Sequence, residues 1–154
     1  MIKILLIEDD SFKARSLQEF VSSVLRDVSI NNASSLVEAI AQVNQEPFDL
    51  VLIDMAIPSH PIIPGAGSPM SFLTGGLDVL LELKSLERSD PCVIITQYPE
   101  IELSGQFFSL QLASREIKEQ LDCDVLACIE YSEGSENWKT ALLEVLKRYE
   151  NTNS

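Results

Sequence analysis

The stretch that decides the fold is Ile2-Lys3-Ile4-Leu5-Leu6-Ile7-Glu8-Asp9-Asp10. Its first part, residues 2–7, is short, rich in β-branched residues and almost entirely apolar, which is typical of a strand buried on both faces of a parallel sheet. Two later runs have the same character: residues 48–53 lead into Asp54, and residues 92–95 lead into Thr96. The sequence therefore predicts buried strands that each end on polar residues.

Helical spacing of apolar residues separates these strands. The first expected helix covers about residues 12–26, and the second begins with the capping box of Ser35 and Glu38. Three further helices are expected where apolar residues recur at helical spacing, within residues 77–86, 110–121 and 138–149. Shorter strands are expected at 28–31 and 125–129. Strands that alternate with helices predict an α/β fold, a doubly wound five-stranded parallel sheet with helices on both faces. We expect a single domain over residues 1–150 with a short tail at 151–154.

The composition narrows the classes of partner. The net charge is -13 and the pI is about 4.3, so the surface should repel nucleic acids and anionic membranes. The three cysteines are not spaced as in a disulfide framework. Together with the lone His60 they do not form the ligand pattern of a zinc site. No apolar run approaches the length of a membrane span, and we expect a cytoplasmic protein.

Three acids should meet at one edge of the predicted sheet. Glu8 and Asp9 follow the first strand directly, and Asp54 follows another. Ligands bind at the carboxyl ends of parallel strands in such folds, and carboxylates gathered there raise one another's pKa values. A hard divalent cation, Mg²⁺ or Mn²⁺, would relieve that repulsion. Asp10, beside the pair, is interpreted as a solvated loop residue.

A metal at this edge would also permit phosphoryl chemistry. With its neighbours screened, Asp54 could act as a nucleophile toward a phosphoryl group. Thr96, at the end of a neighbouring strand, could donate a hydrogen bond to a phosphoryl oxygen.

Three stretches together resemble the receiver domain of two-component response regulators, the CheY-like superfamily. They are residues 4–10, residues 50–58 (Leu-Val-Leu-Ile-Asp-Met-Ala-Ile-Pro) and residues 93–96 (Val-Ile-Ile-Thr), in the family's order. The resemblance covers nearly the whole chain. It implies a flavodoxin-like five-stranded sheet and a signalling role, with a histidine kinase or phosphotransfer protein as phosphate donor.

The resemblance also implies roles for individual residues. Asp54 matches the phosphoacceptor, and Glu8 and Asp9 match the acid pair that holds Mg²⁺ together with Asp54 and the backbone carbonyl of Ala56. Thr96 matches the hydroxyl residue that turns toward the phosphoryl group.

The chain departs from the family at the fifth strand. Where the family carries a lysine followed by proline, this sequence has Glu130 and Tyr131, and Ala127 stands at the aromatic switch position. A lysine about 4 Å from a phosphoryl oxygen is attracted by a few kcal/mol, and a glutamate reverses the sign. The sequence shows no nearby residue that restores the cation. We therefore expect phosphorylation to be inefficient and poorly transmitted.

A second departure is an insertion at residues 59–75, and the stretch before the fifth strand is longer than in the family. The insertion begins one turn beyond Asp54 and is more apolar than a solvent loop requires. We expect it to cap the acidic pocket and to offer a surface to a partner protein.

Three functions remain open from the sequence. The first is a stand-alone atypical receiver that accepts phosphate at Asp54 and signals by docking to a separate output protein. The second is a pseudo-receiver, an interaction module that works without phosphorylation. The third, a metal-dependent hydrolase, is disfavoured because no general base is evident beside Asp54, so we expect no enzyme activity.

Overall fold

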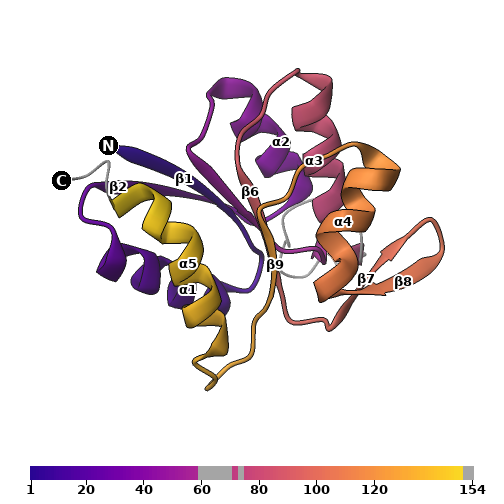
Figure 1. Ribbon diagram of the computed structural model, residues 1–154. Coiled ribbons are helices and arrows are strands. Elements are labelled where there is room, and N and C mark those ends of the chain that lie inside the picture. The colour runs from indigo at the N-terminus through magenta and orange to yellow at the C-terminus, as the bar shows by residue number, and fades with distance from the viewer. Residues whose placement is uncertain (59–70, 73–74, 151–154) are drawn as a thin grey trace, which may run out of the picture.

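A computed structural model of the protein describes residues 1–58, 71–72 and 75–150. Its centre is a five-stranded sheet in the order β2-β1-β3-β6-β9, in which all neighbouring strands run parallel. The strands are β1 (Ile2–Ile7), β2 (Val28–Ala33), β3 (Leu50–Ile53), β6 (Cys92–Thr96) and β9 (Ala127–Glu130). The predicted doubly wound α/β fold is confirmed (Figure 1).

Five helices cover the two faces of this sheet. They are α1 (Ser11–Val24), α2 (Leu36–Gln45), α3 (Gly75–Ser85), α4 (Leu110–Leu121) and α5 (Asn137–Glu150). α1 and α5 pack on one face in one hydrophobic core, and α2, α3 and α4 pack on the other face in a second core (Figure 1). Trp138, at the start of α5, is buried as its helical spacing predicted. Within the described residues, no helix is long and apolar enough to cross a membrane.

The central strands explain why the polar residues gather. β3 and β6 are buried throughout, and β1 is buried except at Lys3. In the register, Ile7 lies beside Ile53, and the Asp54 amide donates to the Ile7 carbonyl at 3.0 Å. Glu8 and Asp54 therefore lie side by side, directly after the ends of β1 and β3.

Two small antiparallel ribbons were not predicted. β4 (Ile57–Pro58) pairs with β5 (Ser71–Phe72), and β7 (Glu100–Leu103) pairs with β8 (Gln106–Ser109). The second ribbon turns at Ser104 and Gly105, both at positive φ, as tight hairpins require. It accounts for much of the extra length before the last strand. The predicted cap over the acidic pocket involves residues 59–75, nearly all of which lie outside the described residues.

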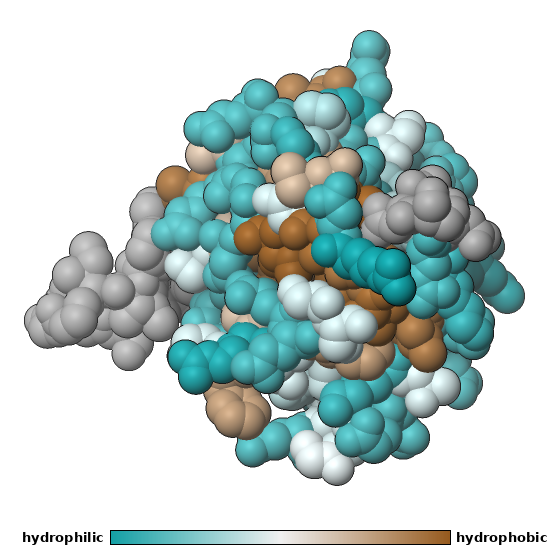
Figure 2. Space-filling view, turned by 90° about the vertical axis from the view of Figure 1, so that its left-hand side faces the viewer, coloured by the Kyte–Doolittle hydropathy of each residue, from teal (hydrophilic) through white to brown (hydrophobic). Residues whose placement is uncertain are grey.

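Figure 2 shows the side of the molecule on which β2 forms the edge of the sheet, and most of that surface is hydrophilic around a smaller hydrophobic area. Large hydrophobic side chains are also exposed elsewhere, including Phe12 on α1 and Phe107 on β8.

Candidate functional site

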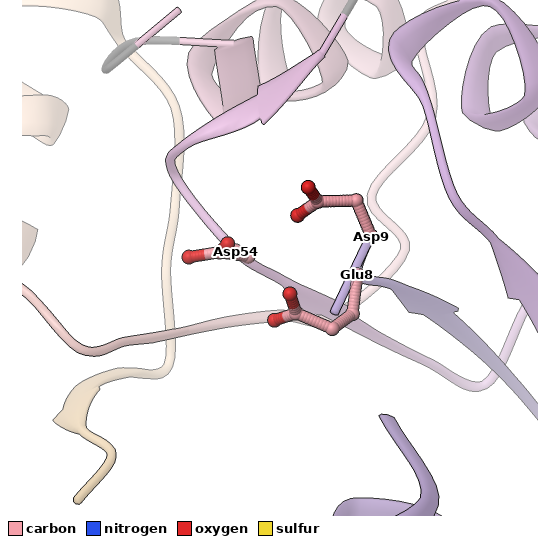
Figure 3. A group of neighbouring side chains, drawn as sticks. All are labelled: Glu8, Asp9 and Asp54. Atoms are coloured by element: carbon pink, nitrogen blue, oxygen red, sulfur yellow. The ribbon is translucent and has the colours of Figure 1, made fainter. Parts of the chain in front are cut away.

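The three predicted acids meet at one point. Glu8 and Asp9 lie just beyond β1 and Asp54 just beyond β3, and their side chains surround one space (Figure 3). One carboxylate oxygen from each residue lies within 4.8 Å of the others. Glu8 and Asp54 are only 2% and 1% exposed, whereas Asp9 is half-buried.

Burial and mutual repulsion disturb the ionisation of this cluster. Removal from water is the largest cause that raises the pKa of Glu8, the charge of Asp54 also raises it and Lys13 lowers it, and the net result is a pKa of about 7. Burial also raises the pKa of Asp9, with a smaller contribution from Asp54. The expected upward pKa shifts are present at Glu8 and Asp9, and burial is the largest cause at both.

The cluster has the donor set of a hard-cation site. Oε1 of Glu8 and both carboxylate oxygens of Asp54 are buried and have no hydrogen-bond partner within the described residues. Buried acceptors without donors are uncommon in folded proteins. Oxygen ligands from carboxylates are those that Mg²⁺ and Mn²⁺ prefer, so the residues present fit such an ion.

Asp10 has a structural task. Its carboxylate caps α1 by accepting the amide hydrogens of Phe12 and Lys13. Its own amide donates to Oε2 of Glu8 at 3.0 Å, which orients that carboxylate. Asp10 is exposed, as expected, and it is not part of the acid cluster.

The sequence shows no cation near Glu130, but the structure brings one to the acid cluster from another element. Nζ of Lys13, on α1, lies 2.6 Å from Oε1 of Glu8 and 3.4 Å from Oδ1 of Asp54. The first contact is a close ion pair, and it lowers the pKa of Glu8 against the effect of burial. The ammonium also donates to the Ile95 carbonyl at 2.9 Å and to Oε1 of Gln97 at 3.1 Å.

A signal for Lys13 was present in the sequence. Lys13, Leu17 and Val21 follow one another at four-residue intervals, and all three are buried on the same side of α1. A lysine at the first position of an apolar stripe, three residues after the acidic run of residues 8–10, indicates a paired internal charge. The search for a cation near Glu130 in the sequence missed it because the compensating residue lies on another element.

The other predicted residues line the neighbouring strand ends. Thr96 is fully buried at the end of β6, and its hydroxyl accepts the Tyr98 amide hydrogen at 3.4 Å. Glu130 lies opposite Thr96 in the register, and its side chain is exposed. Glu130 and Lys13 line the same open pocket of about 330 Å³, together with Tyr131.

Tyr131 is part of the packing beneath this pocket. Its ring is buried, lies 5.1 Å from the ring of Trp138 between centroids, and stands 5.5 Å from Nζ of Lys13. The Tyr131 ring therefore makes a cation–π contact with Lys13 and also packs against Trp138.

Gly76, in the first turn of α3, is a packing residue. A Cβ on Gly76 would lie 2.8 Å from the carbonyl oxygen of Asp54 and 2.8 Å from Cγ2 of Ile53. The Gly76 amide donates to the Met55 carbonyl at 3.1 Å. The first turn of α3 therefore presses directly on the segment that carries Asp54.

Comparison with known proteins decides the family. The response regulator receiver domain model matches residues 4–114. The chain belongs to the response regulator receiver family. This receiver is 31% identical over 147 residues to the Detocs response regulatory protein DtcB of Vibrio alginolyticus, a match over 94% of this chain and 99% of that protein.

Solved receivers share the fold of this receiver. The Mn²⁺-bound form of response regulator Rcp1 superposes with a TM-score of 0.65 at 17% identity, over 100% of this chain and 98% of the other. TrrA of Thermotoga maritima, in complex with Mg²⁺ and BeF, gives a TM-score of 0.60 at 20% identity, over 96% and 98%. Receiver domains bind Mg²⁺ at an acidic pocket, and this receiver has an acidic cluster at its strand ends.

Proposed function

We propose that this receiver accepts a phosphoryl group on Asp54 and passes the signal on by docking to a separate output protein. A histidine kinase or a phosphotransfer protein would be the donor. Residues 1–150 would act as one stand-alone receiver domain in the cytoplasm, with residues 151–154 as a tail, and the protein would be a signalling module with no enzyme activity of its own.

The observation that carries this proposal is the state of the Asp54 carboxylate. It is buried among two other acids and a lysine, and neither of its oxygens has a hydrogen-bond donor within the described residues. An acid placed only for stability would be expected to have its acceptors satisfied. A reacting carboxylate must keep an oxygen free to form a bond.

Each site residue has a task in this reaction. One oxygen of Asp54 bonds to phosphorus while the bond from phosphorus to the donor's imidazole nitrogen breaks, and the imidazole keeps the electron pair and takes up a proton. Glu8, Asp9, Asp54 and the backbone carbonyl of Ala56 would hold Mg²⁺ or Mn²⁺. The bound ion would supply positive charge that screens the acids and the phosphoryl oxygens.

Thr96 would hold the product. Its hydroxyl accepts a hydrogen bond from the Tyr98 amide, which leaves its own hydrogen available for a phosphoryl oxygen.

One observation favours a second function, a pseudo-receiver that works without phosphorylation. Glu130 stands at the rim of the site where the family has a lysine, and its charge opposes an incoming phosphoryl group. Lys13 weighs against this alternative, because it returns a positive charge to within 3.4 Å of Asp54.

The test is exposure of the protein to acetyl phosphate with Mg²⁺, read by intact-protein mass spectrometry. We expect the wild type to gain the mass of one phosphoryl group, and Asp54→Asn to gain none. Omission of Mg²⁺ should abolish the gain. A wild-type protein that gains no mass under conditions that label a receiver of known activity would favour the pseudo-receiver.

A further inference from the structure

We propose that Lys13 supplies the cation that contacts the phosphoryl group on Asp54, a task that has moved in this chain from the end of β9 to the first turn of α1. The inference rests on the proposed function, since it assigns a residue to the product of that reaction. It adds a site residue on an element that the family's motif does not use.

The position of the ammonium is the first argument. Nζ of Lys13 lies 3.4 Å from Oδ1 of Asp54, so a phosphoryl group on that carboxylate would form within reach of the charge. Within the described residues, Lys13 is the only cation that forms an ion pair with Glu8 or Asp54. No arginine or lysine falls in the undescribed segments, so none there can substitute.

The second argument is how the ammonium is held. The Ile95 carbonyl and the Gln97 side chain accept hydrogen bonds from it, and neither group belongs to the acid cluster. Both come from β6 or the residue that follows it, beside Thr96. The cation therefore has anchors that remain when the carboxylates take other ligands.

The third argument is the cost of placing a lysine here. The Lys13 side chain is 2% exposed, and a buried ammonium loses several kcal/mol of hydration that good partners must offset. An apolar residue would continue the stripe of Leu17 and Val21 without that cost. A buried lysine at this place is explained by a negatively charged group that it stabilises, and a phosphoryl group on Asp54 would be such a group.

The space beside Lys13 supports the same assignment. Lys13, Gln97 and Glu130 line one open pocket of about 330 Å³, so Lys13 lies between the acid cluster and a volume that solvent can enter.

The experiment compares binding of Mg²⁺ with binding of beryllofluoride, which mimics a phosphoryl group. The variants are Lys13→Met, which keeps an unbranched side chain one atom shorter and removes the charge, and the double variant Lys13→Met with Glu130→Lys. Lys147→Met is the matched control, because Lys147 forms a lysine–glutamate pair with Glu144 on the exposed surface of α5. Mg²⁺ binding is measured by calorimetry and beryllofluoride binding by fluorine NMR.

We expect Lys13→Met to bind Mg²⁺ at least as tightly as the wild type, since a competing cation is gone. Its Kd for beryllofluoride should rise at least tenfold, which is about 1.4 kcal/mol. The double variant should recover most of that loss, because it places a lysine where the family has one. Lys147→Met should match the wild type in both titrations.

Two results with Lys13→Met would overturn the proposal: beryllofluoride binding within twofold of the wild type, or equal weakening of both ligands with no recovery in the double variant. The latter would mean that Lys13 only supports the structure. If Lys13→Met fails to fold, a crystal structure of the wild type with Mg²⁺ and beryllofluoride decides, because the proposal requires Nζ of Lys13 within hydrogen-bond distance of a fluorine. A wild type that binds Mg²⁺ but no beryllofluoride would instead refute the proposed function.

Discussion

At the scale of single residues, the site is defined by a surplus of buried negative charge. Glu8 and Asp54 share one lysine, so the cluster keeps a net negative charge even before Asp9 is counted. Burial makes that charge costly, which is the reason that the pKa of Glu8 rises to about 7. Two testable consequences follow at this scale, one for Glu8 and one for Glu130.

The first prediction concerns pH. Because folding raises the pKa of Glu8 from 4.5 to about 7, folding favours its protonated form. The stability that this gives is full below about pH 4.5 and is lost as pH rises through about 7. Without metal, the free energy of unfolding should fall between pH 5 and pH 8 by at most about 3 kcal/mol.

Chemical denaturation at several pH values measures this effect. Glu8→Gln, which cannot titrate, is the control and should lose most of the decline. Saturating Mg²⁺ should also remove it, since the ion favours the ionised carboxylate. An identical pH profile in the wild type and Glu8→Gln would contradict the assignment.

The second prediction concerns Glu130. Its side chain is exposed, so solvent screens its charge and the substitution Glu130→Lys should have a modest effect in the wild type. We expect a gain in phosphoryl occupancy of no more than about fivefold, equivalent to about 1 kcal/mol. Glu133→Lys, at a second acid lining the same pocket, is the comparison. Equal gains from both would indicate a general charge effect instead of one at position 130.

At the scale of elements, the site depends on how α3 meets β3. Gly76 lets the first turn of α3 approach the backbone of Asp54 more closely than any side chain would allow. The hydrogen bond from Gly76 to Met55 ties the two segments together. The acid cluster is thus held from the α3 side of the sheet, while Lys13 approaches from the α1 side.

The third prediction tests this contact. Gly76→Ala would place a methyl group 2.8 Å from the Asp54 carbonyl oxygen, so backbone must shift. We expect a loss of about 1–3 kcal/mol in the free energy of unfolding and weaker Mg²⁺ binding. Asp78→Ala, on the exposed side of the same helix, controls for a substitution to alanine in the first turn and should leave Mg²⁺ affinity unchanged. Thermal unfolding and calorimetry measure the two effects.

The elements also show what the sequence could predict. β1, β3 and β6 are apolar runs because parallel strands are buried on both faces, and their polar ends gave the acid cluster directly. The hairpin of β7 and β8 was missed because its alternation is short: only Ile101 and Leu103 are buried on β7. Lys13 was missed although Glu8 lies only five positions before it, because its other acidic partner, Asp54, lies 41 positions away on another element. The pairing with Asp54 becomes visible only when the sheet brings the two elements together.

At the scale of the whole molecule, we expect repulsion within the acid cluster, which the proposed function needs, to lower the stability of the metal-free fold. Both hydrophobic cores end at this edge of the sheet, and a net negative charge remains there without metal. Proteins often keep strained or repulsive groups at functional sites, where a ligand relieves them. Ligand binding should therefore be visible in the stability of the entire fold.

The fourth prediction concerns the effect of this repulsion on stability. Asp54→Asn leaves Glu8 and Lys13 as a balanced pair, so the metal-free variant should be more stable than the wild type by about 1 kcal/mol. Mg²⁺ should raise the unfolding temperature of the wild type by mass action and should have little effect on the variant. Thermal unfolding with and without Mg²⁺ measures both. An equal response of the two proteins to Mg²⁺ would place the ion elsewhere.

The central claim, that Asp54 is the phosphoacceptor, has one direct test. After reaction with acetyl phosphate and Mg²⁺, borohydride reduction converts an aspartyl phosphate to homoserine, and tandem mass spectrometry of peptides locates the converted residue. The account predicts homoserine at position 54, none at Asp9 or Asp10, and no reduction of Glu8 to 5-hydroxynorvaline. Conversion at another aspartate, or full phosphoryl incorporation with Asp54 unchanged, would contradict it.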